Sequence, residues 1–162
     1  MASGVTVRRA GPADRAFIED LGKRTVLSSG SSVRPAPETL LEAGYERLLT
    51  IVFEQSHLAF IAEREGVRLG FLLIVDRLPD EVTLMPQGFI AYMAVEPEAQ
   101  NGGIGAELLR AGEDEARRQG LPYMSLMVTE ENASARALYD REGYVTERRL
   151  LCKPLQGTGS PL

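Results

Sequence analysis

The sequence predicts a mixed α/β fold with the element order β-α-α-β-β-β-α-β-α-β. Two patterns support this prediction: short runs of aliphatic and β-branched residues, and longer stretches in which apolar residues recur at helical spacing. The chain has 162 residues, which fits one domain with a single core. We expect this domain to cover residues 1–155, and residues 156–162, rich in Gly, Ser and Pro, to form a flexible tail.

Each element is predicted by its own local signal. The tight connection at residues 64–66 predicts an antiparallel hairpin between its flanking strands. Gly120 and Pro122 end the clearest helix, and the polar, proline-containing segments 28–37 and 76–86 predict loops. Strands are expected at residues 5–8, 58–63, 67–76, 89–95, 123–128 and 143–153, and helices at residues 14–26, 37–53, 104–119 and 133–141.

Composition argues against several classes of protein. A hydrophobic content of 44% and a charged content of 25% are typical of a globular domain. The longest apolar runs, such as residues 70–75, are strand-sized, whereas a membrane span needs roughly 18 residues. A net charge of −5 argues against a nucleic-acid-binding face, which is basic. We therefore expect neither a membrane nor a nucleic acid as partner.

Metal and export signals are also lacking in the sequence. The single cysteine, Cys152, excludes an internal disulfide and a multi-cysteine zinc site, and the single histidine, His57, has no second histidine to complete a metal site. We therefore expect no bound metal. The first residues show no basic region followed by an apolar one, so we expect a cytoplasmic protein.

A glycine-rich turn joins the strand at 89–95 to the helix at 104–119. Such a turn gathers backbone N–H groups around one concavity at the positive end of the helix, where phosphate binds well. Glycines at a helix start are also common as simple turns, so the turn alone predicts only an anion site. A nucleotide-triphosphatase loop is excluded because no lysine follows the glycines, and a dinucleotide fingerprint because Leu108 replaces its third glycine.

A second motif makes the sequence resemble the GNAT superfamily of N-acetyltransferases. The cofactor loop of that family reads Gln or Arg, two residues, Gly, one residue, then Gly or Ala, and residues 100–105 match every fixed position. The family's second segment is an asparagine, a short helix with Leu-Tyr, and a Gly-aromatic pair. It is matched by Asn132, Leu138, Tyr139, Gly143 and Tyr144. The resemblance covers residues 89–145 strongly and the rest by element order.

The resemblance implies a largely antiparallel central sheet with helices on both faces, and acetyl-CoA as co-substrate. Backbone amides of residues 100–106 would hold its pyrophosphate, and Asn132 would bind it from the far side of a splayed strand pair. The implied binding residues are Met93, Ala94, Val95, Gln100, Asn101, Gly102, Gly103, Ile104, Gly105, Ala106, Asn132, Ala135 and Tyr139. The resemblance also implies that a homodimer could form through residues 146–155.

The implied reaction is acetyl transfer to a primary amine by direct attack on the thioester, with Tyr139 donating a proton to the departing sulfur. An ordinary pKa near 10 keeps a phenol protonated at neutral pH. The acceptor is expected to be a small amine, because residues 126–129 lack the acidic residue that protein N-terminal acetyltransferases often carry. A protein or peptide N-acetyltransferase and a non-catalytic acyl-CoA-binding module stay open.

The general base is not fixed by the sequence. Residues 87–95 contain no carboxylate, although many relatives place a base on that strand. Glu63, Glu130 and Glu131 are candidates, each also compatible with a surface acid. Alternatively, Tyr92 orients a water molecule, or the amine arrives already neutral.

Overall fold

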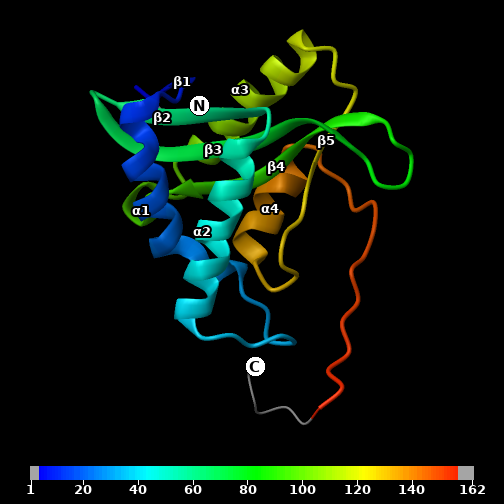
Figure 1. Cartoon of the computed structure of the whole chain (residues 1–162). Helices are drawn as coiled ribbons and strands as arrows, with labels where there is room; N and C mark the ends of the chain where they lie inside the picture. The colour runs from blue at the N-terminus through cyan, green and yellow to red at the C-terminus, as the bar shows by residue number, and fades with distance from the viewer. Residues whose placement is uncertain (1–3, 157–162) are drawn as a thin grey trace.

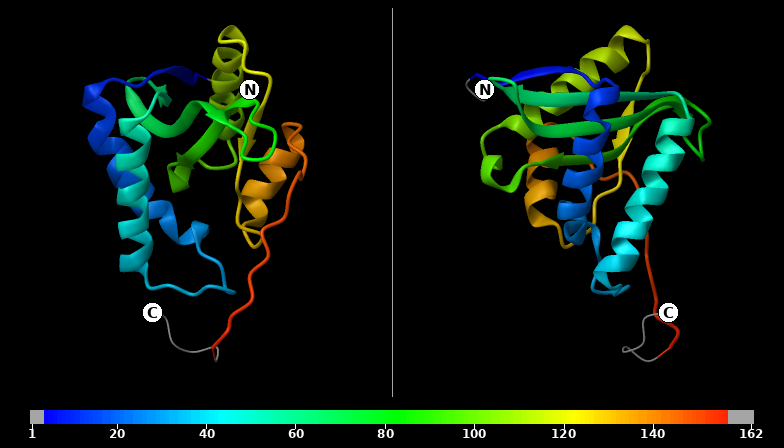
Figure 2. Two further views of the ribbon diagram at one scale, coloured as in Figure 1. Left: turned by 45° about the vertical axis from the view of Figure 1, so that its right-hand side comes forward. Right: turned by 60° about the vertical axis from the view of Figure 1, so that its left-hand side comes forward.

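The computed structural model describes residues 4–156 and places a five-stranded sheet between two layers of helices (Figures 1 and 2). The strands are β1 (Thr6–Arg9), β2 (His57–Arg64), β3 (Val67–Pro79), β4 (Pro86–Val95) and β5 (Met124–Leu126). The helices are α1 (Arg15–Thr25), α2 (Glu38–Glu54), α3 (Ile104–Arg118) and α4 (Ala133–Arg141). Three short 3-10 helices lie at Pro12–Asp14, Val26–Ser29 and Pro97–Ala99.

The sheet has the order β1-β2-β3-β4-β5, and its neighbours are antiparallel except for β4 and β5, which run parallel. The expected mixed, largely antiparallel sheet is therefore confirmed. The parallel pair follows from the chain path, because α3 crosses over the sheet between β4 and β5. β3 continues through residues 76–79, which the sequence placed in a loop, and only residues 80–85 connect it to β4.

Alternation along β3 builds two cores, one on each face of the sheet. Phe71, Leu73 and Val75 pack with residues of α1 and α2, whereas Leu72 and Ile74 pack with residues of α3. Successive side chains of a strand point to opposite faces, so one continuous apolar strand serves both layers. The left view of Figure 2 shows α1 and α2 on one side of the sheet and α3 and α4 on the other.

β4 and β5 separate after a short stretch of pairing. They pair only from Gly88 opposite Met124 to Ile90 opposite Leu126, whereas β4 continues to Val95. A bulge at Ala91, where Leu73 pairs with Tyr92 and Ile74 with Ile90, bends β4 at the point of separation. The fold thus leaves one edge of β4 open beside the start of α3, which is the splayed strand pair that the resemblance implied.

The prediction of a strand at residues 143–153 is wrong. Residues 145–155 are extended and exposed, and none of their backbone groups hydrogen-bonds to another residue within 4–156. A β-rich composition cannot form a strand without a partner edge, and in this conformation the segment leaves the sheet (Figure 1). The predicted flexible tail, residues 156–162, lies outside the described residues apart from Gln156.

Gly22 permits the close packing of α1 on α2, and its replacement is expected to destabilise the domain. A Cβ at Gly22 would overlap the ring of Tyr45, whose hydroxyl donates to the carbonyl of Ile18 at 2.7 Å. Forcing such an overlap typically costs about 1–3 kcal/mol, which outweighs the roughly 1 kcal/mol that alanine gains over glycine in a helix. Chemical denaturation of Gly22→Ala should show this loss in the free energy of unfolding.

Gly44 on α2 is the matched control for this prediction. It is exposed, and nothing lies within 4 Å of a Cβ built on it. Gly44→Ala should therefore raise the free energy of unfolding by about 1 kcal/mol. Equal effects of the two substitutions would contradict the proposed packing of α1 on α2.

Candidate active site

The glycine-rich turn between β4 and α3 has the backbone geometry of an anion site. Asn101 and Gly103 adopt left-handed conformations, with φ of 65° and 82°, and Gly103 is the N-cap of α3. The side chain of Gln100 donates to the carbonyl of Val95 at 3.2 Å, which ties the turn to the end of β4. Within residues 4–156, the amides of residues 101–106 donate to no other residue. Six consecutive amides are therefore available to an anion at the positive end of a 15-residue helix.

Helix α4 packs against this turn. A Cβ built on Gly105 would lie 2.8 Å from Leu138 of α4 and 3.7 Å from Met93 of β4. Ile104 is buried at the start of α3, in the same core that Leu138 and Tyr139 cover. The predicted residues of β4, the turn and α4 are thus brought together in space, although Gly105 and Tyr139 are far apart in sequence.

Tyr139 lies half-buried on α4. Its ring packs edge-on against Tyr144, with 5.8 Å between the ring centroids. Its hydroxyl makes no hydrogen bond to any residue that the structure describes. Burial, and secondarily the nearby phenol of Tyr92, raises the pKa of Tyr139 to about 12. The phenol therefore keeps its proton at neutral pH and has that proton free to donate.

Asn132 is the N-cap of α4. Its Oδ1 accepts from the amide of Ala135 at 3.2 Å, and its Nδ2 donates to the carbonyl of Ser28 at 3.4 Å. The structure therefore shows Asn132 fixing the start of α4. The cofactor contacts expected for Asn132 and Ala135 remain predictions.

The three candidate carboxylate bases are engaged elsewhere or lie in solvent. Glu63 pairs with Arg8 at 3.2 Å on the β1 side of the sheet. Glu131 accepts from the amide and hydroxyl of Ser32 at 2.8 and 3.0 Å, and these bonds lower the pKa of its carboxyl. The side chain of Glu130 is 88% exposed. Glu63 and Glu131 are thus held by partners, and Glu130 lies in solvent 3.5 Å from Arg136.

The end of α1 and the connection from α1 to α2 form a bridge between β4 and the loop before α4, a feature that the sequence analysis missed. On the β4 side, Arg24 makes a bidentate ion pair with Glu96 at 2.7 and 2.9 Å, and Thr25 contacts the hydroxyl of Tyr92 at 3.1 Å. On the other side, Thr129 donates to the carbonyl of Ser29 at 2.9 Å, next to the contacts of Ser28 and Ser32 described above. Sequence offered no signal for these contacts, because the partners lie 67 to 104 positions apart.

Tyr92 is half-buried beneath this bridge. Its ring lies 4.8 Å from that of Tyr45 and stacks on Phe71 at 6.0 Å. These contacts pack the ring of Tyr92 among aromatic side chains of β3 and α2.

One open cavity lies apart from the turn. It has a volume of about 450 Å³ and lies at the start of α1, lined by Ala10, Gly11, Pro12, Arg15, Ile18, Phe53, His57 and Ala59. None of these is a predicted site residue. Among the described residues, no helix is long and apolar enough to cross a membrane, and no group of three or more His, Cys, Asp or Glu side chains could hold a metal.

Comparison with known proteins identifies the family. The family model described as "Acetyltransferase (GNAT) family" matches residues 30–144. Mycothiol acetyltransferase of Streptomyces coelicolor is 33% identical over 87 residues, which are 54% of this chain and 26% of that protein. The corresponding protein of Saccharomonospora viridis is 36% identical over 90 residues, 54% of this chain and 29% of its own length. The match thus spans only about a quarter of these relatives.

Solved structures share the whole fold. A putative acetyl transferase from Pyrococcus furiosus superimposes with a TM-score of 0.79 at 25% identity, covering 93% of this chain and 99% of that one. The aminoglycoside acetyltransferase AAC(6')-Iy, in complex with a CoA bisubstrate analogue, superimposes with a TM-score of 0.68 at 20% identity, covering 96% and 100%. The family model covers well over half of the chain, and the matched residues include the glycine-rich turn and Tyr139. This protein therefore belongs to the GNAT acetyltransferase family.

Proposed function

We propose that this protein transfers an acetyl group from acetyl-CoA to a primary amine, which attacks the thioester directly. The observation that carries this proposal is the row of six unpartnered amides at residues 101–106, beside the open edge of β4 and the free hydroxyl of Tyr139. The pyrophosphate of CoA is the anion that such a row fits, and the left-handed Gly103 lets the backbone approach it closely. Met93, Ala94 and Val95 would lie along its pantetheine arm.

Tyr139 would supply the proton for the sulfur that leaves. A phenol with a pKa of about 12 is a weak acid in the ground state, and it becomes an effective donor only as negative charge builds on sulfur. Among residues 4–156 its hydroxyl has no hydrogen-bond partner, which leaves it free for this contact. In this proposal the proton comes from the hydroxyl group of Tyr139.

No carboxylate is assigned as general base. Glu63 and Glu131 are occupied by Arg8 and Ser32, and Glu130 is almost fully exposed. We propose that the amine arrives neutral from solution, so that kcat/KM follows the pKa of the acceptor as pH rises. Removal of any of the three glutamates would then leave the shape of this pH profile unchanged.

A small amine is the proposed acceptor. The bridge joins the end of α1 to the loop before α4 beside β4, and it would limit the approach of an extended peptide to the edge of β4. A relative and a structural neighbour, mycothiol acetyltransferase and an aminoglycoside acetyltransferase, are named for small acceptors, whereas another protein with this fold is named ribosomal-protein-alanine N-acetyltransferase. The acidic net charge of −5 also favours an acceptor with cationic groups besides the reacting neutral amine over an anionic acceptor.

A thiol-release assay with acetyl-CoA tests the proposal against four acceptor classes: small amines, amino acids, aminoglycoside antibiotics and peptides. We expect release that depends on a small amine and is accompanied by the acetylated amine. Release with peptides alone would indicate a peptide N-acetyltransferase instead. Binding of acetyl-CoA without release for any class would indicate the non-catalytic module.

A further inference from the structure

The hydroxyl group of Tyr92 lies where β4 separates from β5. Tyr92 directly follows the bulge at Ala91. Its ring packs with the core on the α1 and α2 side of the sheet, whereas Tyr139 packs with the core on the α3 side. Burial and, secondly, the phenol of Tyr92 raise the pKa of Tyr139, so the two side chains are close enough to interact electrostatically. The two phenols therefore approach the open edge of β4 from opposite faces of the sheet.

The contact between Tyr92 and Thr25 fixes the direction of the Tyr92 proton. The two hydroxyl oxygens lie 3.1 Å apart, a geometry in which either group can donate. Oγ1 of Thr25 also lies 2.9 Å from the carbonyl oxygen of Leu21 and 3.2 Å from that of Gly22, and a carbonyl oxygen can only accept. A hydroxyl group has one proton. Thr25 therefore donates within α1, and Tyr92 donates to Thr25.

The oxygen of Tyr92 is left as a hydrogen-bond acceptor. Its proton is committed to Thr25, and no residue that the structure describes donates to it. A neutral primary amine has two N–H groups and one lone pair, and the lone pair must point at the thioester carbon before attack. An accepting oxygen that holds one N–H group aims the lone pair in this way. The oxygen of Tyr92 offers this acceptor beside the open edge of β4.

We propose that the hydroxyl oxygen of Tyr92 accepts a hydrogen bond from the acceptor amine and aims its lone pair at the thioester carbon, with Thr25 as the positioning residue for this oxygen. The inference rests on the proposed function and names the group that holds the acceptor in it. Because nitrogen becomes positively charged as it attacks, the hydrogen bond strengthens toward the transition state.

The step balances without a proton on Tyr92. The N–C bond forms and the C–S bond breaks, the nitrogen releases one proton to solvent, and the sulfur takes the proton of Tyr139. Solvent then returns a proton to Tyr139, so that an amine and acetyl-CoA give an amide and the free thiol of CoA. Tyr92 binds the amine but is no base, since the proton it holds has no outlet beyond Thr25.

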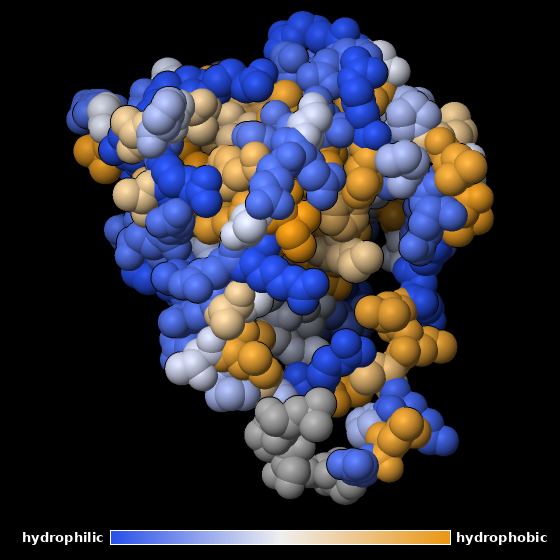
Figure 3. Space-filling view, in the orientation of Figure 1, coloured by the Kyte–Doolittle hydropathy of each residue, from blue (hydrophilic) through white to orange (hydrophobic). Residues whose placement is uncertain are grey.

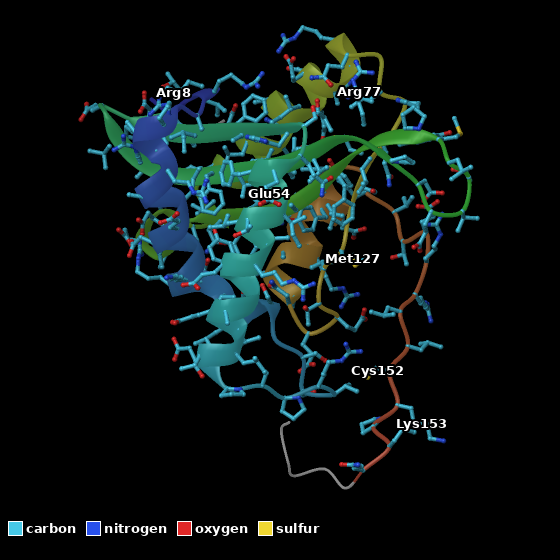
Figure 4. The ribbon with its side chains drawn as sticks, viewed as in Figure 1. Arg8, Glu54, Arg77, Met127, Cys152 and Lys153 are labelled. Atoms are coloured by element: carbon cyan, nitrogen blue, oxygen red, sulfur yellow. The ribbon has the colours of Figure 1, made fainter. Side chains whose placement is uncertain are left out.

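No thiol of this chain competes for the acetyl group. Cys152 is the single cysteine, and it is exposed on the extended segment far from the sheet (Figure 4). An acetylated cysteine is therefore no intermediate at the open edge of β4. The amine itself must be oriented for attack, which is the task assigned to Tyr92.

The surroundings of the Tyr92 hydroxyl suit a polar acceptor. The connection that follows Thr25 carries Ser28, Ser29, Ser31 and Ser32. Figure 3 shows apolar atoms in other places, over the loop between β3 and β4 and along residues 145–155. An amine that reaches Tyr92 past the bridge thus meets hydroxyl groups, which favours a small amine with further polar groups.

Steady-state acetylation by Tyr92→Phe tests the proposal. The probe amines are ethanolamine and the amine that gives the fastest release in the thiol-release assay. We expect kcat/KM for the amine to fall about tenfold to hundredfold, the loss typical of a hydrogen bond to a charged group. The dissociation constant of acetyl-CoA should stay unchanged. The ring keeps its packing on Tyr45 and Phe71, so the variant should fold normally.

A double-mutant cycle with Thr25 separates positioning from a structural role. Thr25→Val removes the oxygen that accepts from Tyr92, whose proton can then turn toward the amine, so kcat/KM should fall severalfold. Thr25→Ser keeps the hydroxyl and should stay within about twofold of the unaltered protein. Because Thr25 acts through the hydroxyl of Tyr92, Thr25→Val should cause no further loss when added to Tyr92→Phe.

Tyr45→Phe is the matched control. The hydroxyl of Tyr45 is buried and donates to the carbonyl of Ile18 at 2.7 Å, so its loss should lower the free energy of unfolding and leave kcat/KM within about twofold. Unchanged kcat/KM in Tyr92→Phe, or losses that multiply in the double variant, would overturn the role of Tyr92 and leave the proposed function in place. Acetyl transfer by the unaltered protein to none of the amines would remove both.

Discussion

Replacing Tyr139 by phenylalanine is expected to lower kcat by about 100-fold or more, the range that a positioned general acid typically contributes. The affinity for acetyl-CoA should stay near that of the unaltered protein, because the hydroxyl acts only as charge develops on sulfur. The substitution should not disturb the fold, since this hydroxyl has no partner among the described residues. Steady-state kinetics combined with calorimetric titration of acetyl-CoA measures both quantities.

Tyr144 provides the matched control. Its ring packs against Tyr139, but its hydroxyl donates to Glu113 at 2.9 Å and is thereby committed to the surface of α3. Tyr144→Phe should leave kcat within about twofold of the unaltered value, the change expected for a group outside the chemistry. With a pKa of about 12, Tyr139 stays protonated below roughly pH 11, so the deficit of Tyr139→Phe should be the same across neutral pH. Unchanged turnover with chemistry rate-limiting would remove Tyr139 from the acid role.

Gly103→Ala should weaken acetyl-CoA binding about tenfold or more. Gly103 has φ of 82°, and holding an L-residue in such a conformation costs about 1–3 kcal/mol. The turn would therefore relax, and its amides would no longer point toward one anion. The dissociation constant of acetyl-CoA should rise, whereas kcat at saturation should change little. Calorimetric titration gives the first value and saturation kinetics the second.

Gly120 lies past the other end of α3 and has φ of 74°, so that an alanine there would meet nearly the same backbone strain as an alanine at position 103. Gly120→Ala should lower the free energy of unfolding by a similar amount and leave acetyl-CoA binding unchanged. If the two substitutions weaken binding equally, the effect of Gly103→Ala comes from lost stability rather than from the phosphate-binding turn.

Much of the fold could be predicted because its signals are local. The amphipathic stretch at 104–119 and the asparagine before residues 133–141 marked α3 and α4 closely, since capping residues and helical spacing act within a few positions. The strand expected at 143–153 failed because a strand is defined by its partner edge, which composition does not reveal. In its place the chain has an extended segment anchored by the ion pair of Arg148 with Asp80.

In the candidate site, too, local features could be predicted from the sequence and contacts between distant residues could not. The glycine turn and Tyr139 could be predicted from short motifs, because the residues of each motif lie close together in the sequence. The bridge that joins Arg24 to Glu96 and Ser32 to Glu131 could not be found, since each contact pairs distant residues through exposed polar groups. The same bridge explains why Glu131, a reasonable base from sequence alone, is engaged elsewhere.

Amide NMR during titration with CoA tests the acetyl-CoA site at residues 101–106, because it reports on each backbone N–H of these residues separately. We expect these amides to shift most, together with the residues of β4 and α4 that face the turn. The residues lining the cavity at the start of α1, such as Gly11 and His57, should shift little. Largest shifts at that cavity, with residues 101–106 unmoved, would contradict the assignment of the turn as the acetyl-CoA site.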